Sequence, residues 1–262
     1  EEELKVMIQM GREAGVLEEA ELRMLQRIFE FSDSVVEQVM VPREQIVGQG
    51  PVMQGLLEQI ARSAPTAATV LVFGESGTGK ELVAQTIHDL SPRRAGPCVA
   101  VNCAAFNESL LESELFGHER GAFTGADRRR IGQFERANRG TLFLDEISTM
   151  KPDLQAKLLR AIEERAIRRV GGTSTFKVDV RILSASNRNL PKMIEEGLFR
   201  EDLYFRLNGA TVWLPPLRER PRDIAILAHR FLAEITHGRE PPTISDGAMQ
   251  RLRGHPWPGN IR

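Results

Sequence analysis

The sequence predicts an α/β domain built on a parallel five-stranded sheet that lies between layers of helices. Three observations support this fold class. From residue 46 onward, short β-branched apolar runs alternate with longer stretches of helical periodicity, which is typical of a parallel sheet covered on both faces. One run, residues 68–73, leads directly into a glycine-rich turn and then a helix. Another, residues 140–144, ends in two adjacent carboxylates.

The other elements follow from the same periodicities. Asn107 to Phe116 has a helical pattern that a loop interrupts, and we expect the helix to resume near Arg128. The remaining expected elements are strands at residues 98–102, 178–184 and 210–214 and helices near residues 52–62, 223–236 and 244–253.

Composition limits the class of protein. The 262 residues are 41% hydrophobic, enough for the core of one large domain with a smaller partner. Lys and Arg total 35 against 36 Asp and Glu, and this balance argues against a protein whose main function is to bind nucleic acid phosphates. Two cysteines, Cys98 and Cys103, exclude a disulfide framework and a structural zinc site and favour a reducing, cytoplasmic location. The longest apolar runs fall far short of the ~20 residues that span a bilayer.

Charge is unevenly distributed along the chain. Residues 1–45 hold eleven Asp and Glu against five Lys and Arg, whereas the remainder holds thirty basic against twenty-five acidic residues. Apolar residues recur at helical spacing in the acidic segment and predict three short amphipathic helices. We therefore divide the chain into an acidic helical segment at 1–45, an α/β core at 46–220 and a partial helical unit at 221–262.

The acidic segment has more than one interpretation. Residues 1–43, which end in VMVPR, resemble the connector before the paired CBS domains of CorC/HlyC-type membrane transporters, although no CBS domain follows. That resemblance implies a regulatory connector or a chimeric gene. An acidic linker that dimerises or packs on the next domain is the alternative. Because the chain starts at Glu1 rather than Met and stops at Arg262 where a helix begins, we expect it to be a fragment.

The glycine-rich turn after residues 68–73 has the P-loop pattern. Glycines let backbone N–H groups curl around phosphates, the following helix adds donors and a positive dipole end, and Lys80 can reach the β and γ phosphates. Glu81 replaces the usual Ser or Thr ligand of magnesium, so we expect Thr78 or a water in that role. A purely structural glycine turn is the alternative. The predicted phosphate-binding residues are Gly74, Glu75, Ser76, Gly77, Thr78, Gly79, Lys80 and Glu81.

Asp145 and Glu146 supply the second half of a nucleotide site. At the carboxyl edge of the sheet Asp145 can hold Mg²⁺, directly or through water, while Glu146 is placed to polarise an attacking water. Asn187, just past the fourth strand, is positioned to sense the γ-phosphate. Considered alone, the acidic pair could be a helix N-cap and Asn187 an ordinary turn residue. No NKxD sequence for guanine recognition is present, so we expect ATP rather than GTP.

A glycine-bounded loop with one aromatic residue narrows the function. Residues 117–126 read GHERGAFTGA, and an exposed Phe on such a loop favours a contact role. GAFTGA is the signature of the AAA+ ATPases that activate sigma-54 RNA polymerase, the bacterial enhancer-binding proteins, and GESGTGKE and GTLFLDEI resemble their Walker motifs. The resemblance covers residues 46–262 and implies an ATP-driven ring, commonly a hexamer, that contacts sigma-54 and remodels the closed promoter complex. The implied contact residues are Gly121, Ala122, Phe123, Thr124, Gly125 and Ala126, with Phe123 and Thr124 foremost.

The same resemblance implies roles at the nucleotide. Asn102 would be the switch residue that holds Glu146 according to nucleotide state. Residues 168–177, with two glycines at the tip, resemble a second loop that helps raise the first. Arg262 would be the sensor II arginine of a truncated helical lid, and Val47 a further nucleotide contact.

Two arginines are implied to act on the neighbouring subunit. Arg200 and Arg206 resemble the pair that enters the adjacent nucleotide site, where an arginine neutralises charge on the transferring phosphoryl group. Local pairing with Glu201 and Asp202 on a helix surface is the alternative.

Two other functions compete with this one. Another AAA+ remodelling ATPase, such as a protein unfoldase or helicase loader, would share the nucleotide motifs but has no reason to carry GAFTGA. A non-hydrolysing, nucleotide-gated scaffold would use the acidic helices for a membrane or partner protein, yet it needs none of the hydrolytic residues. We therefore predict ATP and Mg²⁺ as cofactors, sigma-54 RNA polymerase holoenzyme as partner, a homo-oligomeric ring, and DNA contact only through a domain outside this chain.

Overall fold

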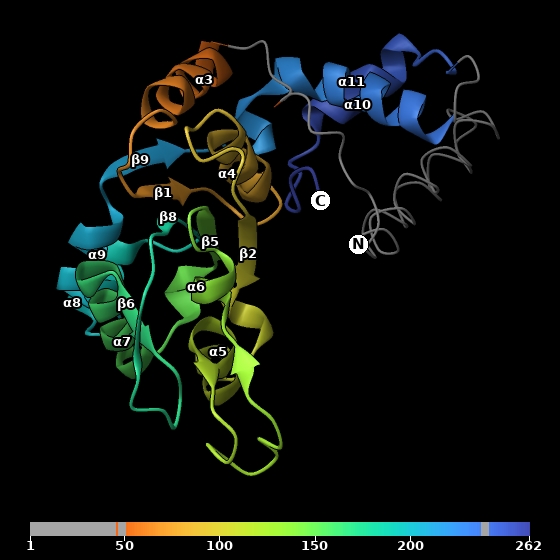
Figure 1. The fold of residues 1–262 in the computed structure, drawn as a ribbon. Helices are drawn as coiled ribbons and strands as arrows, with labels where there is room; N and C mark the ends of the chain where they lie inside the picture. Colours follow the sequence, from red (N-terminus) through yellow and green to blue (C-terminus); the bar gives the residue numbers. More distant parts are fainter. Residues whose placement is uncertain (1–45, 47–50, 237–240) are drawn as a thin grey trace. The chain divides into compact units, whose positions relative to one another are not determined.

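A five-stranded parallel sheet lies at the centre of the fold. The computed structural model describes residues 46, 51–236 and 241–262, and in these residues the strand order is β2–β5–β8–β1–β9 (Figure 1). Every neighbouring pair is parallel, which confirms the predicted fold class. The two motif-bearing strands are not neighbours, because β8 separates β1 from β5. The strands are β1 (Val70–Phe73), β2 (Cys98–Asn102), β5 (Thr141–Asp145), β8 (Arg181–Ser186) and β9 (Ala210–Trp213).

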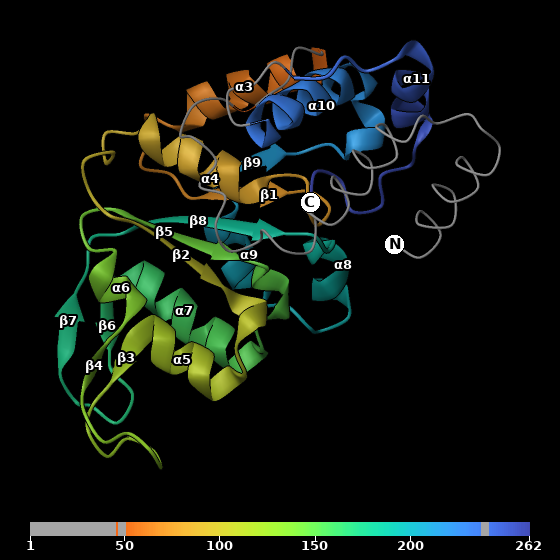
Figure 2. The ribbon, with the colours of Figure 1, turned by 90° about the vertical axis from the view of Figure 1, so that its right-hand side faces the viewer.

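Helices cover both faces of the sheet because successive strand residues point to opposite sides. In β1, Val70 and Val72 pack into one apolar cluster and Leu71 into the other. Figure 2 shows α3 and α4 on one face and α5, α6 and α7 on the other. The helices that cover the sheet are α3 (Pro51–Ser63), α4 (Lys80–Asp89), α5 (Glu108–Phe116), α6 (Gln133–Arg136), α7 (Pro152–Glu164), α8 (Leu190–Glu195) and α9 (Glu201–Leu207).

Two small antiparallel hairpins project from the face that carries α5 and α7 (Figures 1 and 2). The first pairs β3 (Gly117–His118) with β4 (Arg130–Ile131), and the second pairs β6 (Ala166–Arg168) with β7 (Thr175–Lys177). The predicted resumption of the helix near Arg128 is therefore wrong, and α6 begins only at Gln133. The helix does not resume there because residues 130–131 form β4, which pairs with β3. The backbones are so close that a Cβ on Gly132 would lie 2.4 Å from the Gly117 nitrogen.

The C-terminal helices form a unit with its own small core. These are α10 (Pro221–Ile235) and α11 (Asp246–Gly254), close to the predicted ranges, after the short 3₁₀ turn η3 (Leu217–Glu219). Ile224 and Leu227 are buried with Leu217, and Trp257 packs against them. In the described part of the chain, no helix combines the length and the apolar character needed to cross a membrane. The predictions for residues 1–45 and for Val47 lie outside the described residues.

Candidate active site

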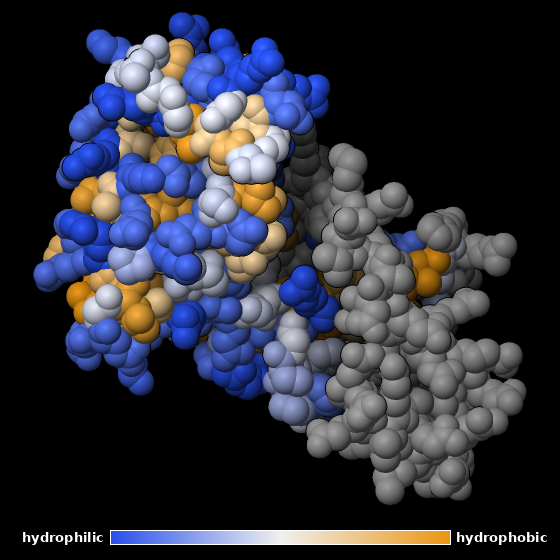
Figure 3. All heavy atoms as spheres, turned by 90° about the horizontal axis from the view of Figure 1, so that it is seen from below, coloured by the Kyte–Doolittle hydropathy of each residue, from blue (hydrophilic) through white to orange (hydrophobic). Residues whose placement is uncertain are grey.

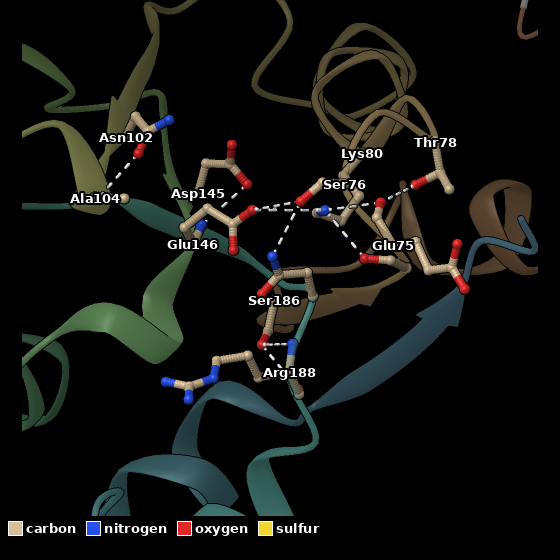
Figure 4. A network of polar contacts seen from close by, with 12 residues as sticks. Glu75, Ser76, Thr78, Lys80, Asn102, Ala104, Asp145, Glu146, Ser186 and Arg188 are labelled. Carbon is tan, nitrogen blue, oxygen red and sulfur yellow. Dashed lines mark hydrogen bonds and ion pairs between the residues drawn. The ribbon is translucent and has the colours of Figure 1, made fainter. Parts of the chain in front are cut away.

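The carboxyl ends of four parallel strands meet at one edge of the sheet. The loop after β1 holds residues 74–79, β2 ends at Asn102, β5 ends at Asp145 with Glu146 next, and Asn187 follows β8. Parallel strands place all these ends at the same edge, which is where open α/β sheets bind ligands. Figure 4 shows these segments converging, with Lys80 and Glu146 facing each other.

We call residues 74–79 the phosphate loop, after the binding role that the sequence predicts for them; they form a tight turn built on glycine. Gly77 and Gly79 have φ angles of 78° and 101°, which favour residues without a Cβ. Gly74 is confined for a different reason, because a Cβ there would lie 2.8 Å from the Leu214 carbonyl oxygen. The loop then enters α4, whose first residue is Lys80. The N–H groups of this turn and the helix start together suit an anion.

Lys80 closes the loop on itself. Its side chain is 6% exposed, and Nζ donates to the carbonyl oxygens of Gly74 at 3.0 Å and Glu75 at 3.1 Å. The same ammonium lies 4.0 Å from Oε1 of Glu146. A buried cation with carbonyl partners can exchange these bonds for phosphate oxygens when a nucleotide enters.

Glu146 sits in a strained and partly buried position. Its backbone is left-handed, with φ 52°, although it is not glycine. Ser76 Oγ donates to its Oε1 at 3.5 Å, and Asn187 Nδ2 donates to Ser76 Oγ at 3.0 Å, so Ser76 bridges the two predicted residues. Burial raises the pKa of Glu146, Lys80 opposes the rise and the neighbouring Asp145 adds to it. A carboxylate of raised pKa at a phosphate site has the properties of a general base.

The structure does not bring together the two predicted magnesium ligands. Thr78 is 2% exposed, and its Oγ1 donates to the Glu75 carbonyl at 2.7 Å inside the loop. Asp145 accepts the Glu146 N–H at 3.0 Å and lies on the other side of Lys80 (Figure 4). The Thr78 hydroxyl is therefore engaged within the turn, whereas the Asp145 carboxylate lies at the end of β5 beside Glu146. Glu81 is exposed on the first turn of α4 and contributes no hydroxyl.

Asn102 does not hold Glu146 in this structure. Its Oδ1 accepts the Ala104 N–H at 2.9 Å, which caps the short 3₁₀ turn η1 (Cys103–Ala105). Asn102 lies opposite Asp145 in the register of β2 and β5, so it is a neighbour of the acidic pair without contacting the glutamate. The described contacts hold no bond between Asn102 and Glu146, so the switch role of Asn102 stays a prediction.

The two predicted arginines lie at the N-cap and in the last turn of α9 and take no part in the network of Figure 4. Arg200, at its N-cap, makes two hydrogen bonds to Asp202 at 3.0 and 2.6 Å, as the local-pairing alternative expected. Arg206, in the last turn, is exposed. Its carbonyl accepts the Thr69 hydroxyl at 2.9 Å, which ties the end of α9 to the residue before β1.

The GAFTGA segment forms the tip of the β3–β4 hairpin. Gly121 N–H bonds the Ala126 carbonyl at 2.9 Å, and Ala126 N–H bonds the Phe123 carbonyl at 3.0 Å. Gly121 and Gly125 have positive φ angles, so the two outer glycines make this compact turn feasible. Phe123 is 41% exposed and rests edge-on against His118, with ring centroids 5.0 Å apart. Figure 3 views the molecule from the end that carries the hairpins, where hydrophobic residues form separate patches among hydrophilic ones.

A buried arginine joins the two hairpins, and sequence reasoning missed it. The Arg169 side chain is 2% exposed and donates to Glu119 at 2.7 Å and to Glu135 at 2.8 and 2.6 Å. Its guanidinium also lies 4.1 Å from the centroid of the Phe176 ring. We call Glu119, Glu135 and Arg169 the hairpin clasp. The Glu119 N–H adds a bond to the Val170 carbonyl at 3.0 Å.

The helical unit touches the phosphate loop, which the sequence did not predict. Arg218 makes two hydrogen bonds to the Glu75 carboxylate at 2.8 and 2.6 Å, and this pairing lowers the Glu75 pKa. Arg220 and Asn260 also reach the loop. In the sequence Arg220 precedes a proline and Asn260 follows a glycine, a pattern typical of ordinary turns. Nothing local in the sequence therefore indicates that they contact the loop. Arg262 is exposed, and its role at the nucleotide stays a prediction.

Together, the parallel sheet, the phosphate loop after β1, the acidic pair after β5, the asparagine after β8 and the helical lid define an AAA+ ATPase. Comparison with known families agrees: the sigma-54 interaction domain matches residues 46–213, and the AAA+ ATPase lid domain matches residues 218–262. The chain therefore belongs to the sigma-54 interaction domain family. Neither match includes the first 45 residues, so nothing supports the resemblance of that segment to a transporter connector.

Relatives and solved structures support the same family. A Nif-specific regulatory protein of Azotobacter vinelandii is 54% identical over 220 residues, which cover 83% of this chain and 42% of that protein. The transcriptional regulatory protein ZraR of Escherichia coli K12 is 52% identical over 219 residues, 83% of this chain and 50% of that protein. NtrX from Brucella abortus in complex with ATP matches with a TM-score of 0.77 at 39% identity, over 93% of this chain and 54% of that one. The chain thus spans about half the length of these relatives.

Proposed function

We propose that this domain hydrolyses ATP to drive activation of transcription by sigma-54 RNA polymerase. The observation that carries the proposal is the coexistence in one compact unit of the phosphate loop and acidic pair at one sheet edge and a projecting GAFTGA hairpin. Residues 74–81 hold the phosphates, and the GAFTGA residues engage sigma-54 in the closed promoter complex.

Each residue at the sheet edge has a chemical task. Lys80 leaves its carbonyl partners, Gly74 and Glu75, to neutralise the β and γ phosphates. Glu146 accepts a proton from the attacking water, and its raised pKa makes it a stronger base than an ordinary carboxylate. Asn187 and Ser76 form a relay from the end of β8 to Glu146, so a shift of Asn187 toward a γ-phosphate would move the base.

Magnesium fits beside Asp145. Carboxylate oxygen and water are the ligands that Mg²⁺ prefers, and the Thr78 hydroxyl is already bonded to the Glu75 carbonyl inside the loop, whereas Asp145 ends β5 at the same sheet edge. We therefore assign Asp145 as the protein ligand, with waters and phosphate oxygens completing the shell. The bound ion would neutralise charge that develops on the phosphates.

A second subunit completes the site. Within one chain, Arg200 and Arg206 are absent from the network around Lys80, and Arg206 is exposed on α9. An arginine supplied from a neighbour is worth roughly 10³ to 10⁵ in rate in GTPases. We therefore propose a homo-oligomeric ring, in the cytoplasm with the polymerase, whose specific ATPase activity rises with protein concentration. Activity that stays flat while light scattering records assembly would refute the role of the arginines.

A capture experiment tests the contact with sigma-54. Immobilised sigma-54 should retain the protein with ADP and aluminium fluoride, a mimic of the γ-phosphate in transfer, and release it without nucleotide. Phe123→Ala should abolish capture, whereas Phe106→Ala should retain it. The two phenyl groups are a matched pair, because Phe123 is 41% and Phe106 40% exposed.

Both variants should hydrolyse ATP like the unaltered protein. Equal capture with and without the nucleotide mimic, or equal loss of capture in both variants, would contradict the proposal. Loss of hydrolysis together with capture in Phe123→Ala alone would instead indicate a structural loop.

A further inference from the structure

Three consecutive carbonyl groups of the phosphate loop accept hydrogen bonds from the lid side of the molecule. The Ser76 carbonyl accepts from Asn260 Nδ2 at 3.0 Å, and the Gly77 carbonyl from the Ile261 N–H at 2.9 Å. The Thr78 carbonyl accepts from Arg220 Nη2 at 3.1 Å. These donors precede α10 or follow α11, so they come from both ends of the lid. We call Arg220, Asn260 and Ile261 the lid backing.

Peptide planarity turns these bonds into a constraint on the phosphate side. In a trans peptide the carbonyl of one residue and the N–H of the next point in opposite directions. A carbonyl fixed toward the lid therefore fixes the following N–H toward the inside of the loop. The three bonds in this way orient the N–H groups of Gly77, Thr78 and Gly79. In agreement, the Thr78 N–H makes a long bond of 3.4 Å to the Glu75 carbonyl, the same oxygen that Lys80 binds.

Asn260 is built for this position. It is 2% exposed and has a left-handed backbone with φ 58°, a conformation that asparagine tolerates better than most residues. Its Nδ2 reaches both the Ser76 carbonyl and Glu75 Oε2, at 3.0 and 3.2 Å, while its Oδ1 accepts the Leu217 N–H at 2.8 Å. The amide nitrogen thus connects the lid exit to the phosphate loop, and the amide oxygen connects it to η3.

Arg220 is a buried cation aimed at the loop. It is 4% exposed, and burial lowers its pKa while nearby Asp223 opposes that shift. Its Nη1 lies 3.4 Å from the sulfur of Met53 in α3, so the guanidinium is held between that helix and the Thr78 carbonyl. Desolvating a guanidinium is costly, and the bonds of Nη1 and Nη2 offset that cost only in part, because the buried Nε has no hydrogen-bond partner among the described residues.

We propose that the lid backing is a positioning device for nucleotide binding: it holds the phosphate loop with its N–H groups presented before ATP arrives. The inference rests on the proposed role of residues 74–81 and adds residues that act through the carbonyl groups of that loop. Loss of one backing bond lets the loop populate other conformers, and apparent affinity falls in proportion to the competent fraction. A loop that is competent about one tenth of the time binds about tenfold more weakly.

Two variants and a matched control test this proposal with a fluorescent ADP. Asn260→Asp keeps the oxygen that accepts from Leu217 but loses the donor to Ser76. Arg220→Met keeps the volume and loses the charge, and Arg220→Lys restores one donor. Arg222→Met removes an exposed arginine two residues away. We expect Asn260→Asp and Arg220→Met to raise the Kd for ADP and the KM for ATP about tenfold, with kcat within twofold.

Arg220→Lys should recover part of the affinity, and Arg222→Met should match the unaltered chain. A purely structural role would lower the melting temperature of the nucleotide-free protein without changing the Kd, and that result would overturn the inference. Lys80→Ala distinguishes a failure of the lid backing from a failure of the phosphate-binding role assigned to the loop. If Lys80→Ala loses ADP while the backing variants bind normally, only the lid backing is refuted. Normal binding by Lys80→Ala would overturn the assignment of the loop and the inference with it.

Discussion

Removing Arg169 should loosen both the fold and the connection between the two hairpins. The Arg169→Met substitution preserves most of the side-chain volume and leaves Glu119 and Glu135 without their cation. Removing one partner of a fully buried pair costs about 3–5 kcal/mol. Here the carboxylates are partly exposed, 36% for Glu119 and 18% for Glu135, so they regain some hydration. We therefore expect the free energy of unfolding to fall by about 2–3 kcal/mol.

The assay is thermal and chemical unfolding of the variant beside a matched control. A loss of this size in a domain of about 200 residues lowers the melting temperature by about 5–10 °C. Arg168→Met changes the preceding residue, which is exposed, and should shift the melting temperature by no more than about 2 °C. A double-mutant cycle with Glu135→Gln should give a coupling energy of about 0.5–3 kcal/mol.

The functional readout follows from where the hairpin clasp lies. It shares no residue with the phosphate loop, so the KM for ATP should stay within twofold. It does fix the base of the GAFTGA hairpin to the second hairpin, so capture of sigma-54 should lose its dependence on the γ-phosphate mimic. A fall in unfolding free energy below about 1 kcal/mol, or capture that still follows the nucleotide, would refute the reasoning.

Three further predictions concern the site and the core. Glu146→Gln should lower kcat by about 10²- to 10⁴-fold in steady-state hydrolysis while ADP still binds; a fall below fivefold would exclude Glu146 as the base. Because burial raises the pKa of Glu146, the base is lost as pH falls through a value above the ~4.3 of an ordinary glutamate, and a pH profile of kcat should show this acid limb in the unaltered protein. Arg181→Met should cost about 2–4 kcal/mol in urea unfolding, since this 3% exposed side chain donates to the carbonyls of Ala68, Ala64 and Ser63 at 3.2, 2.7 and 2.8 Å. Arg62→Met, on an exposed ion pair at the end of α3, should change the same curve by less than about 0.5 kcal/mol.

The sequence predicted the parts of the site that are local in the chain. A β-branched run followed by glycines and Lys80 specifies strand, turn and helix over a dozen residues, and the structure has β1, the loop and α4 there. Parallel order then brings Asp145 and Asn187 to the same edge without further information. The expected strand at 178–184 is displaced to Arg181–Ser186, because Val178 and Asp179 are occupied by contacts to Arg165 and Arg139.

What the sequence could not predict depends on residues distant along the chain. The bonds from Asn260 cross more than 180 positions to Glu75 and Ser76, and no periodicity encodes such a pairing. The hairpin clasp unites three segments in the same way. The switch role of Asn102 stays a prediction: in this structure its Oδ1 accepts the Ala104 N–H, a capping bond that an asparagine at a strand end can make.

The left-handed backbone at Glu146 places stability and activity in opposition. A glycine at this position would relieve strain of about 1 kcal/mol, so the domain would be expected to unfold at a higher temperature. It would also lose the carboxylate that we assign as the base. A library selected for stability alone, without selection for hydrolysis, should therefore enrich glycine at position 146. Such enrichment would indicate that Glu146 is retained for its chemistry although it destabilises the fold.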